Sequence, residues 1–189
     1  MDITIEQLKE KVKTYQEVLQ NTESYRQEWQ SATKALITTT LNQIISETAL
    51  KARVIERSSI DNLEAVILDL GHSSSGLAES LDNTDVKRIM IKKNGAIIYQ
   101  QLFNGKIMVM IENPHIEGYG DPKAPISLAI LRPDEISTPV IYEHVIHMLG
   151  HIIEWEDYDD DDKGEKIAFQ PIGFRHTLSA DSNESTANQ

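Results

Sequence analysis

The sequence predicts an α+β fold, in which an N-terminal helical hairpin lies beside an antiparallel β-meander sheet of five to six strands and one C-terminal-side helix covers the sheet. Three observations predict it: regular apolar spacing near the start, β-rich runs joined by Asn-Gly pairs in the middle, and an amphipathic segment opened by a proline. The expected divisions are a helical region over 1–51, a sheet domain over 52–178 and a small, polar, disordered tail over 179–189.

The first helix has a start signal and one narrow apolar stripe. Thr4 and Gln7 are spaced to form a capping box, in which each side chain binds the backbone N–H of the other residue. The apolar residues that follow are 3, 4, 3 and 4 positions apart: Ile5, Leu8, Val12, Tyr15 and Leu19. This spacing keeps a stripe turned toward a partner helix, and it predicts a homodimer.

A second helix is expected after Asn21 and Thr22, because either residue can cap a new helix N-terminus. Its apolar residues repeat at spacings of 4, 3 and 4, and the apolar face continues to about residue 50: Tyr25, Trp29, Ala32, Leu36, then Leu41, Ile44 and Ile45. Two helices joined by so short a connection are expected to pack as an antiparallel hairpin.

The middle of the chain is predicted to be sheet. Asn94-Gly95 and Asn104-Gly105 separate three β-rich runs, and Asn-Gly is typical of the type I′ turns that close two-residue hairpins. These runs are therefore expected to form a three-stranded meander. The runs are 87–93, 96–103 and 106–111, and further extended segments are expected at 52–57, 63–70, 126–131 and 169–178.

The last helix is expected from Pro139 to Trp155, with Ser137 or Thr138 at the cap and proline at the first helical position. Its apolar side is predicted to face the core: Ile141, Val145, Met148, Leu149 and Ile152. Five metal-ligating side chains lie together on the other flank: His144, His147, His151, Glu143 and Glu154. Imidazole and carboxylate suit zinc, manganese, iron or nickel.

Helix geometry limits this hypothetical metal site. His147 and His151 are one turn apart and can share an ion, whereas His144 and His151 are separated by about 10 Å of helix rise. A third ligand would have to come from elsewhere, and His115 and His176 are the candidates. The favoured interpretation is a solvated face on which the histidines pair with neighbouring glutamates.

Several catalytic and binding motifs fail when their spacing is checked. Glu143 precedes His144, which is the wrong order for HExxH, and neither frame of the acidic run provides the ligands of an EF-hand loop. The segment Gly71–Gly76 has one residue too many for a nucleophile elbow, and it lacks the Lys-Ser/Thr that ends a P-loop. A plain loop is expected there.

Charge is unevenly distributed in this acidic chain. Its net charge is −12, and residues 143–162 hold eight acids without a single Lys or Arg. Such a run repels nucleic acid and attracts divalent cations or a partner with a basic surface, although a solvated acidic loop is the favoured interpretation. Lys87, Arg88, Lys92 and Lys93 precede Tyr99 and Phe103 on neighbouring strands, which is one arrangement that binds single strands, but the overall acidity argues against it.

The function predicted from these patterns is that of a non-catalytic binding or assembly module, with no cofactor. The 189 residues include no cysteine, no apolar leader and no run long enough to span a bilayer, so a cytoplasmic protein is expected. The alternative is a divalent-metal-binding protein or metal-dependent enzyme that uses His147 and His151, with Glu143 or Glu154 as ligand or base.

Overall fold

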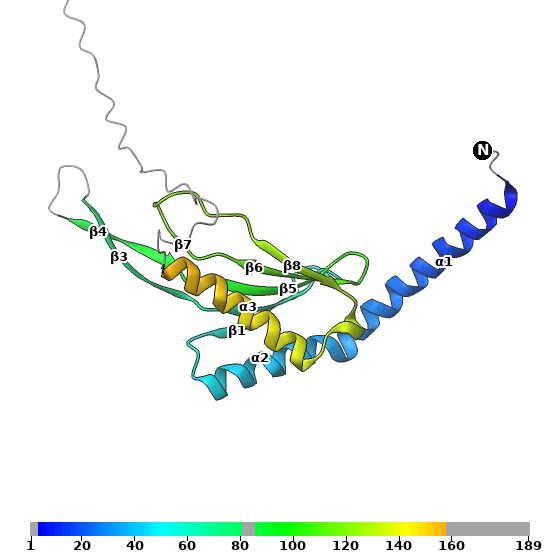
Figure 1. Ribbon diagram of the computed structural model, residues 1–189, viewed down its shortest axis with the longest axis horizontal. Helices are drawn as coiled ribbons and strands as arrows, with labels where there is room; N and C mark the ends of the chain where they lie inside the picture. The colour runs from blue at the N-terminus through cyan, green and yellow to red at the C-terminus, as the bar shows by residue number, and fades with distance from the viewer. Residues whose placement is uncertain (1–3, 81–85, 158–189) are drawn as a thin grey trace, which may run out of the picture. The chain divides into compact units, whose positions relative to one another are not determined.

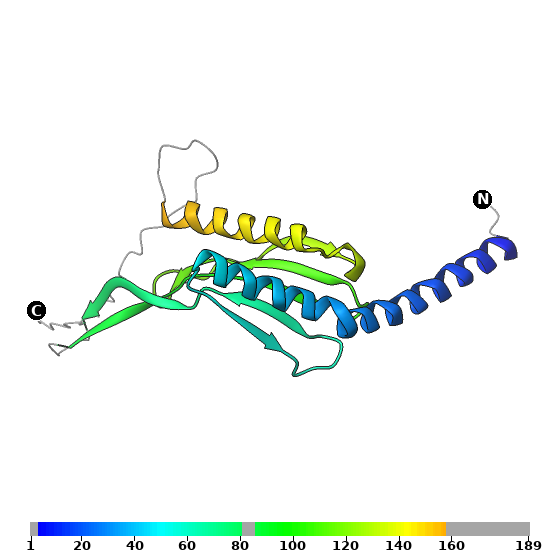
Figure 2. The same ribbon diagram turned by 90° about the horizontal axis from the view of Figure 1, so that it is seen from below.

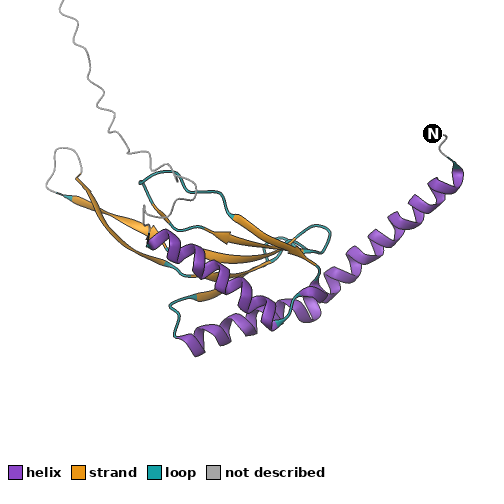
Figure 3. Ribbon diagram, in the orientation of Figure 1, coloured by secondary structure: helices purple, strands orange, loops and turns teal. Residues whose placement is uncertain are grey.

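A computed structural model describes residues 4–80 and 86–157, and it confirms the α+β class (Figures 1 and 3). The helical elements are α1 (Ile5–Glu28), η1 (Trp29–Thr33), α2 (Lys34–Thr48), η2 (Pro133–Glu135) and α3 (Thr138–Glu156). The strands are β1 (Arg53–Arg57), β2 (Ala65–Asp69), β3 (His72–Ser80), β4 (Lys87–Lys93), β5 (Ala96–Gln101), β6 (Ile107–Glu112), β7 (His115–Ile116) and β8 (Ile126–Leu131).

The N-terminal helical hairpin was a wrong prediction, because α1, η1 and α2 form one uninterrupted helix (Figure 1). The capping box of Thr4 and Gln7 is present as predicted and begins this helix. Thr22 does not cap a second helix: its hydroxyl donates to the carbonyl of Val18, 3.0 Å away, so the side chain is satisfied inside the helix. Thr22 therefore does not interrupt the helix, and the chain continues as one helix beyond it.

One turn of the long helix, η1, is a π-helix. The N–H of Lys34 donates to the carbonyl of Trp29, five residues earlier, so this turn holds one residue more than an α-helical turn. Because of the extra residue, the positions that face the core after Trp29 are shifted by one along the sequence. The predicted inward positions Ala32 and Leu36 are exposed instead. The buried stripe on this part of the helix is Trp29, Thr33, Ile37, Thr40 and Leu41.

The main sheet has five antiparallel strands in the order β1-β2-β5-β6-β8. Four predicted strands are confirmed in it: those around residues 53–57, 65–69, 107–112 and 126–131. The predicted hairpin between β5 and β6 is also confirmed, with Ile97 opposite Ile111 and Tyr99 opposite Val109. Because side chains alternate along a strand, these pairs lie on one face of the sheet.

The meander prediction was wrong at its first turn. β4 does not pair with β5 but with β3 and β7, in a separate three-stranded sheet. The paired strands β2 and β5 continue into this ribbon at Gly71 and Gly95, both with positive φ, where Asn94 donates from Nδ2 to the Leu70 carbonyl at 3.1 Å. The loop predicted over Gly71–Gly76 is therefore mostly strand β3.

Neither Asn-Gly pair forms the predicted type I′ turn. That turn needs positive φ at both residues, and among the described non-glycine residues only Ala49 and Asn62 have it. At the β5–β6 connection, Gly105 alone has positive φ, and its N–H donates to the carbonyl of Leu102 at 2.8 Å. This is the longer hairpin loop in which a type I turn is followed by a left-handed glycine.

Helices α2 and α3 lie side by side over one face of the five-stranded sheet (Figure 2). α3 confirms the predicted helix over 139–155, with the proline in its first turn. The core between the layers is built mainly from α2, α3 and alternate positions of β2, β5 and β6: Ile37, Leu41, Val66, Leu68, Ile97, Tyr99, Ile107, Val109, Ile111, Ile141, Val145, Met148 and Ile152. α2 thus shares one core with the sheet, and the division at residue 51 stays a prediction.

Several predictions concern residues that the structure does not describe. These are the extended segment at 169–178, the tail at 179–189, the acids Asp159–Asp162 and the candidate ligand His176.

Candidate functional site

The apolar stripe predicted for the first helix is present on α1, and it faces solvent. None of its residues is buried, although it is 24 residues long. The stripe residues are about half exposed: Ile5 58%, Leu8 55%, Val12 47%, Tyr15 62% and Leu19 52%. Figures 1 and 2 show α1 continuing past the layers that α2, α3 and the sheet form.

An exposed apolar stripe of this kind is a common feature of contact surfaces. A helix with the spacing of Ile5, Leu8 and Val12 is stabilised when the stripe is buried, because packing of an apolar face supplies most of the stability of helices in proteins. Contiguous apolar residues on a protein surface typically mark sites of protein association. Lys9 and Lys13 flank the stripe one position after Leu8 and Val12, and Glu6 holds the same position after Ile5, so lysines outnumber acids at that edge of its N-terminal half.

The base of α1 is held by the β5–β6 loop. Arg26 donates from Nη2 to the carbonyl of Phe103, 2.6 Å away. Gly105 lies directly against the helix: a methyl group added to it would come within 2.7 Å of the Cβ of Tyr25 and 3.0 Å of the carbonyl oxygen of Thr22. Because the loop and the helix backbone touch here, the direction of α1 is set by the sheet.

A partly buried ionic network, centred on the buried Glu64, holds the π turn beside β2. The indole N–H of Trp29 donates to Oε2 of Glu64 at 3.0 Å, and the ammonium of Lys34 lies 3.1 Å from the same oxygen and 3.3 Å from Glu56. Burial alone would raise the pKa of Glu64, but hydrogen bonds from Trp29, Gln30 and Lys34 outweigh it, and the pKa is lowered. Glu64 is thus ionised and anchors both ends of the π turn.

His144, one of the predicted metal ligands, lies on the buried side of α3 and not on the polar flank. It is 9% exposed, and its Nδ1 lies 3.3 Å from the hydroxyl of Tyr99 on β5. Burial lowers the pKa of His144, an effect that the Glu143 carboxylate opposes and that His147 reinforces. The physical reason for the difference is Tyr99, which gives the imidazole a hydrogen-bonding partner inside the core.

We predict that His144 makes the protein less stable at mildly acid pH. Because its pKa is lower in the folded chain than the unfolded value of about 6.5, the unfolded chain takes up the proton first. The contribution of His144 to the free energy of unfolding is therefore at its maximum above that pH, and it decreases as the pH falls toward the folded-state pKa. Urea unfolding between pH 7.5 and 5 measures this. His144→Phe should flatten the slope, whereas the control His151→Gln should keep it; an unchanged slope in His144→Phe contradicts the prediction.

The other predicted metal ligands are on the outward side of α3. Glu143, His147 and Glu154 are exposed, and Nδ1 of His151 lies 3.9 Å from Glu154. His115 lies on β7, opposite Lys93 of β4. Within residues 4–80 and 86–157, no three His, Cys, Asp or Glu residues are grouped as a metal ion requires. Metal binding on this helix stays a prediction.

The basic strand β4 is engaged with acidic residues of the same chain. Lys92 lies 2.6 Å from Glu156 of α3 and over the ring of Trp155, and Lys93 lies 3.6 Å from Glu112 of β6. Tyr99, one of the two aromatic residues in the predicted single-strand-binding arrangement, is fully buried in the core.

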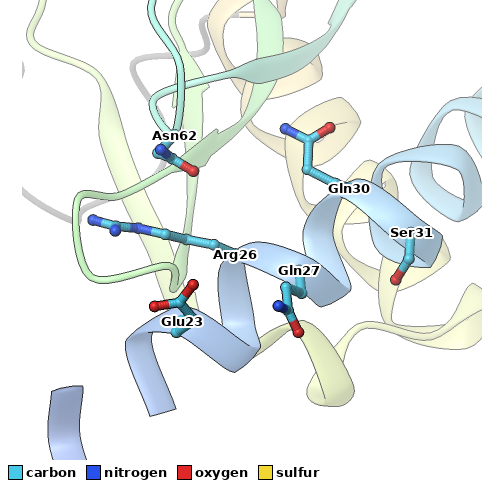
Figure 4. A pocket seen from close by; sticks show the side chains of 6 residues that line it. All are labelled: Glu23, Arg26, Gln27, Gln30, Ser31 and Asn62. Atoms are coloured by element: carbon cyan, nitrogen blue, oxygen red, sulfur yellow. The ribbon is translucent and has the colours of Figure 1, made fainter. Parts of the chain in front are cut away.

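An open hollow of 560 Å³ lies beside the base of α1 (Figure 4). Its lining is polar: Glu23, Arg26, Gln27, Gln30, Ser31 and Asn62. Arg26 extends toward the loop that carries Asn62, whereas Gln27 and Ser31 point away from it (Figure 4). Side chains that diverge in this way do not converge on a bound molecule, so the hollow is secondary to the stripe.

Sequence reasoning missed a second apolar stripe, on the outward side of α3. Tyr142, Ile146 and Ile153 are exposed there, and Leu149 is half-buried between them. Their spacing of 4, 3 and 4 was a signal in the sequence. It was overlooked because the helix was divided into one apolar side and one polar flank, whereas its apolar residues extend past the core face on the side away from the histidines.

The fold and its surface define an α+β protein with an extended, apolar-striped helix. Comparison with known proteins adds no relationship: no family model, no curated sequence and no solved structure matches the chain. In the part of the chain that the structure describes, no helix is both long and apolar enough to cross a membrane.

Proposed function

We propose that this chain is a non-catalytic assembly module that pairs with a second copy of itself, with α1 as the docking helix. The observation that carries the proposal is the exposed stripe from Ile5 to Leu19 on a helix without a buried residue. Its alternating spacings of 3 and 4 match the geometry by which one helix packs along another.

The attachment of α1 supports a docking role. The helix passes without a break into α2, whose residues Ile37 and Leu41 are in the core. Arg26 and Gly105 fix its base to the β5–β6 loop. A helix held in one direction loses little conformational entropy when it binds, and preorganisation of this kind strengthens association.

The double variant Leu8→Glu/Val12→Glu is expected to be monomeric where the unaltered chain is dimeric. Each apolar side chain contributes about 1.5–3 kcal/mol when it is fully buried, so losing two from each copy raises the dimer Kd by at least about 100-fold. Light scattering of the full chain at micromolar concentration measures the mass.

The matched control is Thr14→Glu/Asn21→Glu, which adds two negative charges to the same helix away from the stripe. This control should remain dimeric. Circular dichroism should show the same helix content in all three proteins. A monomeric unaltered chain at micromolar concentration, or a stripe variant that still dimerises, refutes the proposal.

A further inference from the structure

The outward side of α3 has the form of a receiving surface for a helix. Ile146 and Ile153 are 67% and 62% exposed, and with Tyr142 and Leu149 they form a stripe whose 4, 3, 4 spacing matches that of α1. The α3 stripe rises about 17 Å along its helix and the α1 stripe about 21 Å, so the two are comparable in length.

Gly150 adds to this interpretation because none of the residues that the structure describes explains it. Glycine is among the poorest helix formers, yet Gly150 lies inside α3 beside Ile146. A methyl group added there would meet no atom within 4 Å. The absence of a side chain lets another backbone approach closely at this point.

Charge favours α1 as the occupant. Glu143 and Glu154, both exposed, border the α3 stripe on one side, each one position after a stripe residue. Lys9 and Lys13 likewise lie one position after a stripe residue of α1, where they outnumber Glu6, and Lys13 also lies 4.0 Å from Glu17 of its own helix. Opposite charges at the edges of two apolar stripes favour pairing and set its orientation.

Direct pairing of α1 with α1 of the second copy is less well supported. The stripe from Ile5 to Leu19 covers about two heptads, whereas coiled coils typically need three to four. In a parallel, in-register pair the flanking positions that face each other, such as Lys11 and Gln16, also provide no pair of opposite charges. The edge of the α3 stripe offers Glu143 and Glu154 as partners of opposite charge.

We propose that α1 of each copy lies along the outward stripe of α3 of the other copy, an inference that rests on the proposed pairing through α1. The base of α1 contacts η2, the turn just before α3, so α1 leaves the body at the N-terminal end of α3. A two-fold axis beyond that end makes the exchange reciprocal and closes the dimer.

Site-specific crosslinking tests this contact, since the chain contains no cysteine of its own. A tagged Val12→Cys chain is mixed with an untagged Ile146→Cys chain and oxidised in air. Disulfides form only when the Cα atoms lie within about 7 Å, so the expected product is the mixed dimer. The control pair, Thr14→Cys with Ile146→Cys, should not link. A Val12→Cys chain that links mainly to itself overturns the inference in favour of an α1–α1 pair.

A charge exchange tests the orientation independently. Lys9→Glu/Lys13→Glu should raise the dimer Kd by about 10-fold or more, and mixing it with Glu143→Lys/Glu154→Lys should restore tight pairing between the two variants. Ile146→Glu/Ile153→Glu should raise the Kd by about 100-fold. If these α3 changes leave the dimer Kd unchanged, α1 does not bind the outward stripe of α3. That result overturns the inference, while the proposed pairing through α1 stands. A chain that is monomeric from the start refutes both.

Discussion

Trp29→Ala is expected to lower the free energy of unfolding by about 3–5 kcal/mol, the usual range when a large buried aromatic residue is truncated. Trp29 is fully buried in the shared core, and its indole N–H binds Glu64. The variant therefore leaves a cavity and deprives a buried carboxylate of one of its donors, and both effects destabilise the fold. Urea unfolding followed by circular dichroism measures the loss.

Two further variants separate these effects. Trp29→Phe keeps most of the packing but removes the donor, and it should lower the free energy of unfolding by about 1.5–3 kcal/mol, the range for hydrogen bonds to charged groups. Trp155→Ala is the matched control, since Trp155 is only half-buried near the end of α3. Its effect should be clearly smaller. Equal losses for Trp29→Ala and Trp155→Ala would show that the π turn is not a centre of stability.

Gly105→Ala is expected to destabilise the protein by about 2–4 kcal/mol, from backbone strain combined with a steric clash. The residue has φ +78°, which disfavours any side chain. Its new methyl group would lie 2.7 Å from the Cβ of Tyr25, so the loop has to move away from the helix. That movement also disturbs the hydrogen bond from Arg26 to Phe103, which fixes the base of α1.

Gly118→Ala isolates the clash from the strain. Gly118 also has φ +78°, but a methyl group there meets no atom within 4 Å. It should therefore show only the backbone effect, about 1 kcal/mol. Thermal unfolding of both variants gives the comparison. If Gly105→Ala and Gly118→Ala lowered the stability equally, the contact between the β5–β6 loop and α1 would not contribute to the stability of the protein.

The elements that local patterns predicted correctly are those whose signals were themselves local. The proline and the periodicity of residues 138–156 predicted α3, the capping box at Thr4 predicted the start of α1, and β8 has its predicted bounds. Each signal depends on neighbours a few residues away, so no knowledge of the tertiary structure was needed.

Two of the failures have a different cause, because each depended on a distant partner. The Ser- and Gly-rich segment after Gly71 is a strand because β4 pairs with it, not because its composition favours extended structure. His144 is buried because the hydroxyl of Tyr99, 45 residues away, lies above it. Of the candidate site, the α1 stripe was predictable from spacing, whereas its exposure was not.

The π turn between Trp29 and Lys34 has one more consequence. Deleting one exposed residue from it would restore ordinary α-helical winding within the same turn, because the π turn is wider by one residue, and the stripe of α1 would keep nearly the same direction relative to α2. A deletion within α1 itself differs, since it would rotate every side chain on its N-terminal side by about 100° around the helix axis while α2 stayed in the core. A chain of this kind can therefore lose one residue at the π turn without redirecting α1.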